Sequence, residues 1–199
     1  MREKDFDHDA CEKAIRMLLS AMGEDPDREG LASTPSRVAR SWKEMTEGYH
    51  QEAREVLKTT DGTNGFSEVG GYDQMIVVTS IPFDSTCEHH MLPFRGIVDV
   101  AYVPGKSGRC VGLSKIPRLV DMYGRRLQVQ ERLTQQIADT IMDHLDPLGV
   151  GVRVTAHHQC VSCRGVKKQG VQMVTEALLG AFREHPVRDE FWNLTRARV

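Results

Sequence analysis

The chain has 199 residues, of which 40% are hydrophobic and 27% are charged, and it carries a net charge of −2. This composition is ordinary for a soluble domain with a hydrophobic core, and it gives no bulk attraction to nucleic acid or to an anionic membrane. No apolar run approaches the roughly 18 residues of a membrane span and the N-terminus does not resemble a signal peptide, so we expect a cytoplasmic protein without membrane or nucleic-acid partners.

The first third of the chain predicts helices followed by a loop. Apolar residues recur with a helical period over residues 8–22, and a second helix is predicted to begin at Thr34, its expected cap. Residues 58–71 are rich in Gly, Thr, Asn and Asp, which predicts a mobile loop. We therefore divide the chain into an N-terminal helical segment with this loop, residues 1–71, and a catalytic domain, residues 72–199.

The second part of the chain predicts strands and helices in an α+β order. Alternating or continuous apolar residues predict strands. Apolar residues that recur every four positions predict the longest helix. The predicted strands cover residues 75–78, 97–103, 149–155 and 171–179, and the predicted helices follow Ser114 and cover residues 128–145 and 188–198. This order favours an antiparallel sheet with helices on one face.

Two clusters of cysteine and histidine stand out from this pattern. Cys87 and His90 lie between the first two strands, and His158, Cys160 and Cys163 follow the third strand. Thiolate and imidazole are ligands that zinc prefers, and five cysteines are an odd number for a disulfide scaffold. Three protein ligands with an open position make a catalytic zinc site, whereas four make a closed structural site. The spacing alone leaves both kinds of site open, because Cys163 can serve as a fourth ligand.

Several short motifs together connect the chain with a known family. They include Cys87-Glu88-His89-His90 and the blocks at residues 23–26, 28–31, 34–39, 112–115, 128–134 and 160–165. These motifs occur in the order in which the zinc-dependent GTP cyclohydrolase I family has them, and the chain resembles that family from about residue 11 to 192. The resemblance implies the tunnelling fold, in which antiparallel sheets of several subunits close a barrel. It also implies a homodecamer of two pentameric rings with active sites between subunits, and the conversion of GTP and water to 7,8-dihydroneopterin triphosphate and formate.

The resemblance assigns the metal ligands and the groups that transfer protons. It makes Cys87, His90 and Cys160 the ligands of Zn²⁺, with water in the fourth position, where zinc lowers the pKa of water from about 16 toward ~7. His89 and His158 match the family's proton-transferring histidines, a role that suits a side chain whose ordinary pKa is near neutral.

The resemblance also assigns the groups that hold the base. Glu131 matches the residue that reads guanine, since a carboxylate accepts from both N1–H and the exocyclic amine, and Gln130 is expected to contribute to the same pocket. The alternative is that Glu131 is a solvated acid that stabilises the first turn of a helix.

The remaining assignments concern the ribose and the triphosphate of GTP. Lys115, Arg118 and Arg164 match family positions near the triphosphate, which needs several cations. Ser114 matches a serine near the ribose, where the sugar opens and rearranges, and an ordinary role as helix cap is compatible with that one.

Five residues depart from the usual family pattern, namely Ser80, Thr86, Cys163, Met173 and Ala177. Their expected proximity to the pocket leaves open a specialised relative that stops at a ring-opened formamidopyrimidine or serves secondary metabolism. Two rivals also stay open. One is a 7-deazaguanine nitrile reductase, which needs a nucleophilic cysteine and NADPH, and the other is a non-catalytic zinc scaffold.

Overall fold

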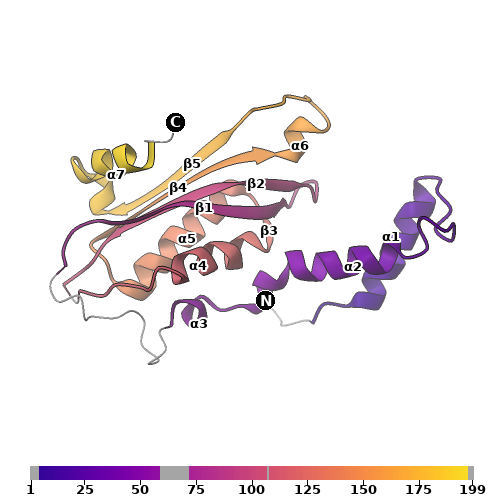
Figure 1. The fold of residues 1–199 in the computed structure, drawn as a ribbon, viewed down its shortest axis with the longest axis horizontal. Helices are drawn as coiled ribbons and strands as arrows, with labels where there is room; N and C mark the ends of the chain where they lie inside the picture. Colours follow the sequence, from indigo (N-terminus) through magenta and orange to yellow (C-terminus); the bar gives the residue numbers. More distant parts are fainter. Residues whose placement is uncertain (1–4, 59–71, 107, 197–199) are drawn as a thin grey trace.

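A five-stranded sheet forms the centre of the molecule (Figure 1). The computed structural model describes residues 5–58, 72–106 and 108–196. In chain order the elements are α1 (His8–Ala21), α2 (Thr34–Met45), the 3-10 helix η1 (Glu47–His50), α3 (Ala53–Leu57), β1 (Ile76–Cys87), β2 (Pro93–Val103), α4 (Lys115–Gly124), β3 (Leu127–Gln128), α5 (Gln130–Leu145), β4 (Gly149–His158), α6 (Gln159–Ser162), β5 (Met173–Gly180), the 3-10 helix η2 (Ala181–Arg183) and α7 (Val187–Arg196). The predicted α+β class is confirmed. None of the helices in the described part of the chain is long and apolar enough to cross a membrane.

The strands lie in the order β3-β1-β2-β4-β5. The four long strands pair in antiparallel fashion, and the short β3 pairs in parallel with the end of β1. The sequence predicted these four strands, but three of them too short: β1 continues to Cys87, β2 already begins at Pro93, and β4 continues to His158. The apolar pattern missed these ends because polar residues alternate with buried ones there, and because Pro82 is tolerated on the outer edge of β1.

The hydrophobic core fills the space between the sheet and helices α4 and α5, which lie together on one face (Figure 1). Val98 and Val100 of β2, with Val152 and Val154 of β4, are fully buried against them. The prediction of helices on one face therefore holds for the long helices of the second part. The last helix, α7, lies on the opposite face, where Phe191 packs against Phe182 and Ala101.

The N-terminal helices α1 and α2 pack on one another and project from the end of the sheet (Figure 1). This N-terminal arm exposes three apolar side chains, namely Met17 and Leu18 in α1 and Met22 directly after it. The short helix α3, which the sequence did not predict, contributes the fully buried Leu57 to the main core. The predicted domain boundary and all but the first residue of the predicted mobile loop lie outside the described residues, so the division of the chain stays a prediction.

Two predicted helix caps are wrong. Thr34 is the first residue of α2 and follows Ser33, which makes no side-chain cap bond. Ser114 precedes α4 and makes no such bond either. A capping side chain requires an extended backbone at its own residue, whereas Ser33 and Ser114 have helical backbones, with ψ of −2° and −15°. Capping therefore does not explain Ser114.

Candidate functional site

Cys87, His90 and Cys160 come together at one end of the sheet. Cys87 ends β1, His90 lies in the turn after it, and Cys160 lies in α6 directly after β4. Their ligand atoms all lie within 4.8 Å of one another, although Cys87 and Cys160 are far apart in the chain. The turn is closed by its own backbone, since Cys87 N–H donates to Leu92 O at 2.9 Å and Met91 N–H donates to Cys87 O at 2.8 Å.

These three side chains fit a metal ion with three protein ligands. In a tetrahedral zinc site the ligand atoms are roughly 3.5–4 Å apart, so a small adjustment brings the three atoms to binding distance. Burial, and then the neighbouring Cys87 sulfur, raise the pKa of the Cys160 thiol, and a cation between the two sulfurs would favour their thiolates instead. Cys163 is exposed and is not part of this group.

An arginine of α5 ties the ligand-bearing turn to the helix. The guanidinium of Arg132 donates from Nη2 to the carboxylate of Glu88, which directly follows Cys87, and to Leu127 O at 3.2 Å. Glu88 N–H in turn donates to Gln128 O at 3.0 Å, and Arg132 Nε donates to Gln128 Oε1 at 3.0 Å. The hydrogen bond from Arg132 lowers the pKa of Glu88. The position of the turn therefore depends on the start of α5.

His158 lies beside this group at the end of β4. Its ring stacks on Phe94 with the centroids 4.6 Å apart and the planes within 3°. Its Nε2 lies 2.8 Å from Gln130 Oε1. Burial lowers the pKa of His158, and the negative charge of Glu131 partly opposes that shift. Glu131 is exposed in the first turn of α5, so the structure brings the predicted base reader close to the predicted proton carrier.

His89 and Arg164 lie on the open side of the metal ligands. The side chain of His89 is 66% exposed, and its Nε2 lies 4.0 Å from Glu88 Oε1. Arg164 Nη1 lies 3.1 Å from His90 Nε2 and 3.5 Å from Cys160 O. His89 is thus free to reach a bound molecule, and Arg164 adds a positive charge next to the ligands.

Gln130 lies in the interior rather than at the surface of the site. Its side chain is fully buried, and its amide nitrogen lies 3.0–3.1 Å from Val154 O, Met173 O and Thr175 Oγ1. These contacts, together with the one to His158, give the amide a role within the protein. Its expected contact with guanine stays a prediction.

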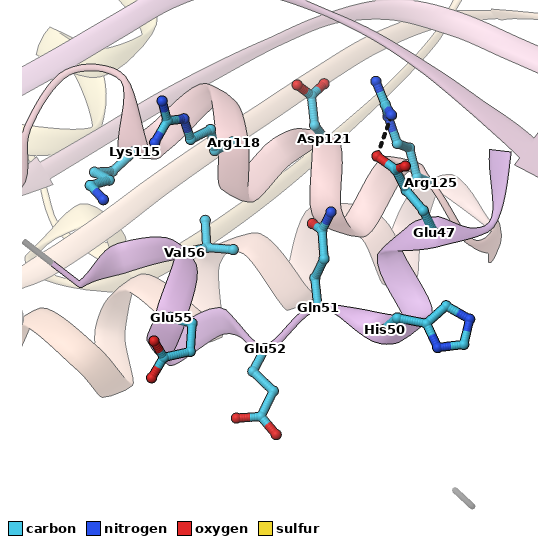
Figure 2. A pocket seen from close by; sticks show the side chains of 10 residues that line it. All are labelled: Glu47, His50, Gln51, Glu52, Glu55, Val56, Lys115, Arg118, Asp121 and Arg125. Atoms are coloured by element: carbon cyan, nitrogen blue, oxygen red, sulfur yellow. Dashed lines mark hydrogen bonds and ion pairs between the residues drawn. The ribbon is translucent and has the colours of Figure 1, made fainter. Parts of the chain in front are cut away.

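Lys115 and Arg118 lie in a separate cavity (Figure 2). The cavity has a volume of about 690 Å³ and lies between α4 and the η1–α3 segment. Glu52 and Glu55 line it together with the two cations, as does Arg125, which is paired with Glu47. None of the three metal ligands contributes to its lining. Within one chain, Lys115 and Arg118 are therefore not united with the predicted metal centre, whereas Arg164 lies beside it. Ser114 lies at the start of the same helix α4 as Lys115 and Arg118.

One of the unusual residues is not where the sequence suggested. Ser80 lies seven residues before Cys87 on β1, which at about 3.3 Å per residue places it roughly 23 Å from the metal ligands. Its expected closeness to the pocket is wrong, because β1 is much longer than predicted. Thr86 does adjoin Cys87, and the carbonyl of Met173 lies against Gln130. Ala177 is buried in the core.

The sequence analysis missed Phe94 and Arg132, and it named Gln130 only for a contact with guanine and not as a buried residue. Phe94 and Arg132 gave no signal, since an aromatic residue in a strand and a surface arginine on a helix are both ordinary. Gln130 did give one: it lies on the same face of α5 as the buried Leu133, Thr134 and Ile137. A polar residue on a buried helical stripe requires hydrogen-bond partners in the interior, and this signal could have been used.

Comparisons with known proteins agree on one family. A sequence model described as GTP cyclohydrolase I matches residues 11–196. A protein of Streptomyces coelicolor named GTP cyclohydrolase 1 is 50% identical over 194 residues, which cover 98% of this chain and 93% of the relative. Relatives of the same name from Corynebacterium glutamicum and Mycobacterium tuberculosis are 46% and 51% identical, over 97% and 89% of this chain and 95% and 85% of theirs.

The link between Arg132 and Glu88 generates a first prediction. Arg132→Met removes the donor that holds the ligand-bearing turn on α5 but keeps much of the apolar stem of the side chain. Groups that orient metal ligands typically account for 10- to 100-fold in metal affinity, so we expect the dissociation constant for Zn²⁺ to rise about tenfold. Competition with a chromogenic chelator measures it.

The matched control is Arg28→Met, which removes another exposed arginine–glutamate pair, with Glu24, on the N-terminal arm. It should leave the zinc affinity unchanged. An equal loss in both variants would contradict the role of Arg132.

Proposed function

Because the chain belongs to the GTP cyclohydrolase I family, we propose that it converts GTP and water into 7,8-dihydroneopterin triphosphate and formate, the first step of pterin and folate biosynthesis. The observation that carries this proposal is the group of Cys87, His90 and Cys160, found in a chain whose relatives are named for that activity. Family membership rules out the nitrile reductase, and the enzymatic relatives argue against a scaffold. A cytoplasmic location remains part of the proposal.

The metal of the proposed enzyme is zinc. Two sulfurs and one imidazole are a donor set that zinc prefers over harder cations. When bound there, zinc acts as a Lewis acid that makes water a nucleophile near neutral pH, which attack at C8 of guanine requires. Cys163 has no part in this set, which favours a catalytic site with an open position over a structural one.

The protein's own side chains bind the base and move the protons. Glu131 accepts from the N1–H and the exocyclic amine of guanine, and its exposure next to His158 supports this role. His158 and His89 exchange protons with the purine nitrogens as the imidazole ring opens and formate leaves. The half-buried His158 is held in place, whereas the exposed His89 can follow the substrate.

The triphosphate and the ribose are bound by residues of α4 and by Arg164. Lys115 and Arg118 hold the phosphates together with Arg164, and Ser114 lies at the ribose. Since Lys115 and Arg118 line a cavity apart from the metal ligands, the complete site is formed between subunits.

Further features support an oligomer, proposed here as a decamer. Among residues 5–58, 72–106 and 108–196, no strand pairs with the outer edge of β5, and β1 pairs on its outer side only at Thr86 and Cys87. Such edges are normally covered in stable proteins, and a barrel closed by several subunits covers them. The apolar residues exposed on α1 are also suited to contacts between chains.

The function and the metal are tested together. The purified protein should hold about one zinc ion per chain and release formate and a fluorescent pterin from GTP in equal amounts. Cys160→Ser should lose both the zinc and the activity, whereas Cys163→Ser, the matched control, should keep both. Zinc lost from Cys163→Ser but retained by Cys160→Ser would contradict the ligand assignment. A product equal to GTP plus one water, without formate, would identify an enzyme that stops at the ring-opened stage.

Loss of a group that binds the base should raise KM, whereas loss of a group that moves protons should lower kcat. Glu131→Gln presents a donor to the donors of guanine, so KM should rise by a factor that corresponds to about 1–3 kcal/mol, with little change in kcat. His89→Ala should keep zinc and KM but lower kcat by about a hundredfold and accumulate a ring-opened intermediate, detected by mass spectrometry.

The controls for this comparison are Asp139→Asn, an exposed acid further along α5, and His157→Ala, whose ring bonds Val171 O instead of Gln130. Both should behave as wild type. Wild-type kcat in His89→Ala would refute its role in proton transfer.

Sharing of the site between chains is tested by complementation. Lys115→Ala and His158→Ala should each lower the activity by about a hundredfold when expressed alone. When they are co-expressed, sites that take an intact α4 from one chain and an intact histidine from another should restore about a quarter of the activity in random mixtures. Co-expression of Cys160→Ser with His158→Ala should restore none, because both changes affect one half of the site. Failure of the first pair, or full activity in monomers by sedimentation, would contradict a shared site.

A further inference from the structure

The amide of Gln130 is oriented by the groups around it. Its nitrogen lies 3.1 Å from Val154 O and 3.0 Å from Met173 O, and a carbonyl oxygen can only accept. Rotating the amide by half a turn would place Gln130 Oε1 against these two oxygens in the interior. The nitrogen must therefore face the two carbonyls, and Oε1 must face His158.

This orientation decides which nitrogen of His158 carries the proton. His158 Nε2 lies 2.8 Å from Gln130 Oε1, which has no proton to give. The bond forms only if His158 Nε2 donates, so the neutral ring has its proton on Nε2 and its lone pair on Nδ1. The tautomer thus follows from fixed neighbours and not from a free choice of hydrogen positions.

Two threonines hold Gln130 itself. The hydroxyl of Thr134 donates to the backbone oxygen of Gln130 at 2.7 Å and lies 2.6 Å from the hydroxyl of Thr175. Thr175 Oγ1 lies 3.1 Å from Gln130 Nε2. Because Thr134 gives its one proton to Gln130 O, Thr175 must donate to Thr134, and Thr175 Oγ1 is then a third acceptor beside the two protons of the Gln130 amide. Gln130 and Thr134 are almost completely buried, so water does not compete for these bonds.

We propose that Gln130 is a positioning residue that keeps the proton of neutral His158 on Nε2 and reserves Nδ1 for proton exchange with the substrate. The stacking of His158 on Phe94 fixes the plane of the ring, and Gln130 fixes its rotation within that plane. This inference rests on the proposed function and refines it, since it makes Gln130 act through His158 rather than on guanine.

The test compares Gln130→Met with Thr175→Val in the zinc-loaded protein. Gln130→Met has a similar volume but no acceptor for His158, so kcat should fall about tenfold or more while KM and zinc content stay within about threefold of wild type. Thr175→Val removes a partner of the same buried amide but leaves the bond to His158, and its kcat should stay within about threefold. In a His158→Ala background, Gln130→Met should cost no further activity, because the residue it positions is gone.

A second readout does not depend on turnover. NMR of the protein with ¹⁵N-labelled histidine should show neutral His158, assigned by its loss in His158→Ala, as the Nε2–H tautomer in wild type and in Thr175→Val. In Gln130→Met the two tautomers should mix. If Gln130→Met does not fold, the wild-type and Thr175→Val spectra still decide the tautomer.

Three results would overturn the inference. The first is an Nδ1–H tautomer in wild type, and the second is a folded Gln130→Met with wild-type kcat. The third is a raised KM with unchanged kcat, which would return Gln130 to direct contact with the base. Absence of GTP turnover in wild type would refute the proposed function instead, while the spectrum would still report whether Gln130 orients His158.

Discussion

The register of β2 against its neighbours determines where the groups of the site lie. Phe94 pairs with His158 on one side and with Ser85 on the other, so a slip of β2 by one residue would move Phe94 to the opposite face of the sheet, away from the ring of His158. The strands approach so closely at Gly96 that a Cβ atom there would come within 1.9 Å of Thr155 O. Any side chain at this position would force β2 and β4 apart just where they align Phe94 with His158.

A bulge in β1 determines which side chains of that strand face the interior as it approaches the metal ligands. The pairing with β2 shifts between Val78 and Ile81, and Ser80 adopts a positive φ of 59° while its N–H donates to Asp99 Oδ1 at 2.9 Å. After the bulge, Ile81, Phe83, Ser85 and Cys87 all face the interior. Bulges commonly redirect side chains in this way. Ser80 is therefore distant from the ligands, yet it lies where the strand acquires the phase that buries Cys87.

The sequence predicted the parts of the site that depend on residue type, and it failed where the fold alone decides. The spacing of Cys87 and His90 and the choice of donor atoms pointed to a metal site, and the family resemblance selected Cys160 rather than Cys163 for the three-ligand group that the structure assembles. The stacking of Phe94 could not be predicted, because it depends on the register of two strands separated by more than forty residues. The separation of Lys115 from the metal ligands could not be predicted either, since motif order in a chain contains no information on distance. The burial of Gln130 was within reach, because its place on the stripe of α5 marked it as an interior polar group.

The charges in the α4 cavity bear on how a triphosphate would be held under the proposed function. Besides His50, its lining contains three cations, Lys115, Arg118 and Arg125, and four acids, Glu47, Glu52, Glu55 and Asp121. Arg125 is already paired with Glu47, so Lys115 and Arg118 share the lining with Glu52, Glu55 and Asp121 without a surplus of positive charge. A ligand with several negative charges gains little from such a balanced surface. Under the proposed function, cations from beyond this cavity must tip the balance, and Arg164, exposed beside the metal ligands, supplies such a charge once another chain brings the two halves together.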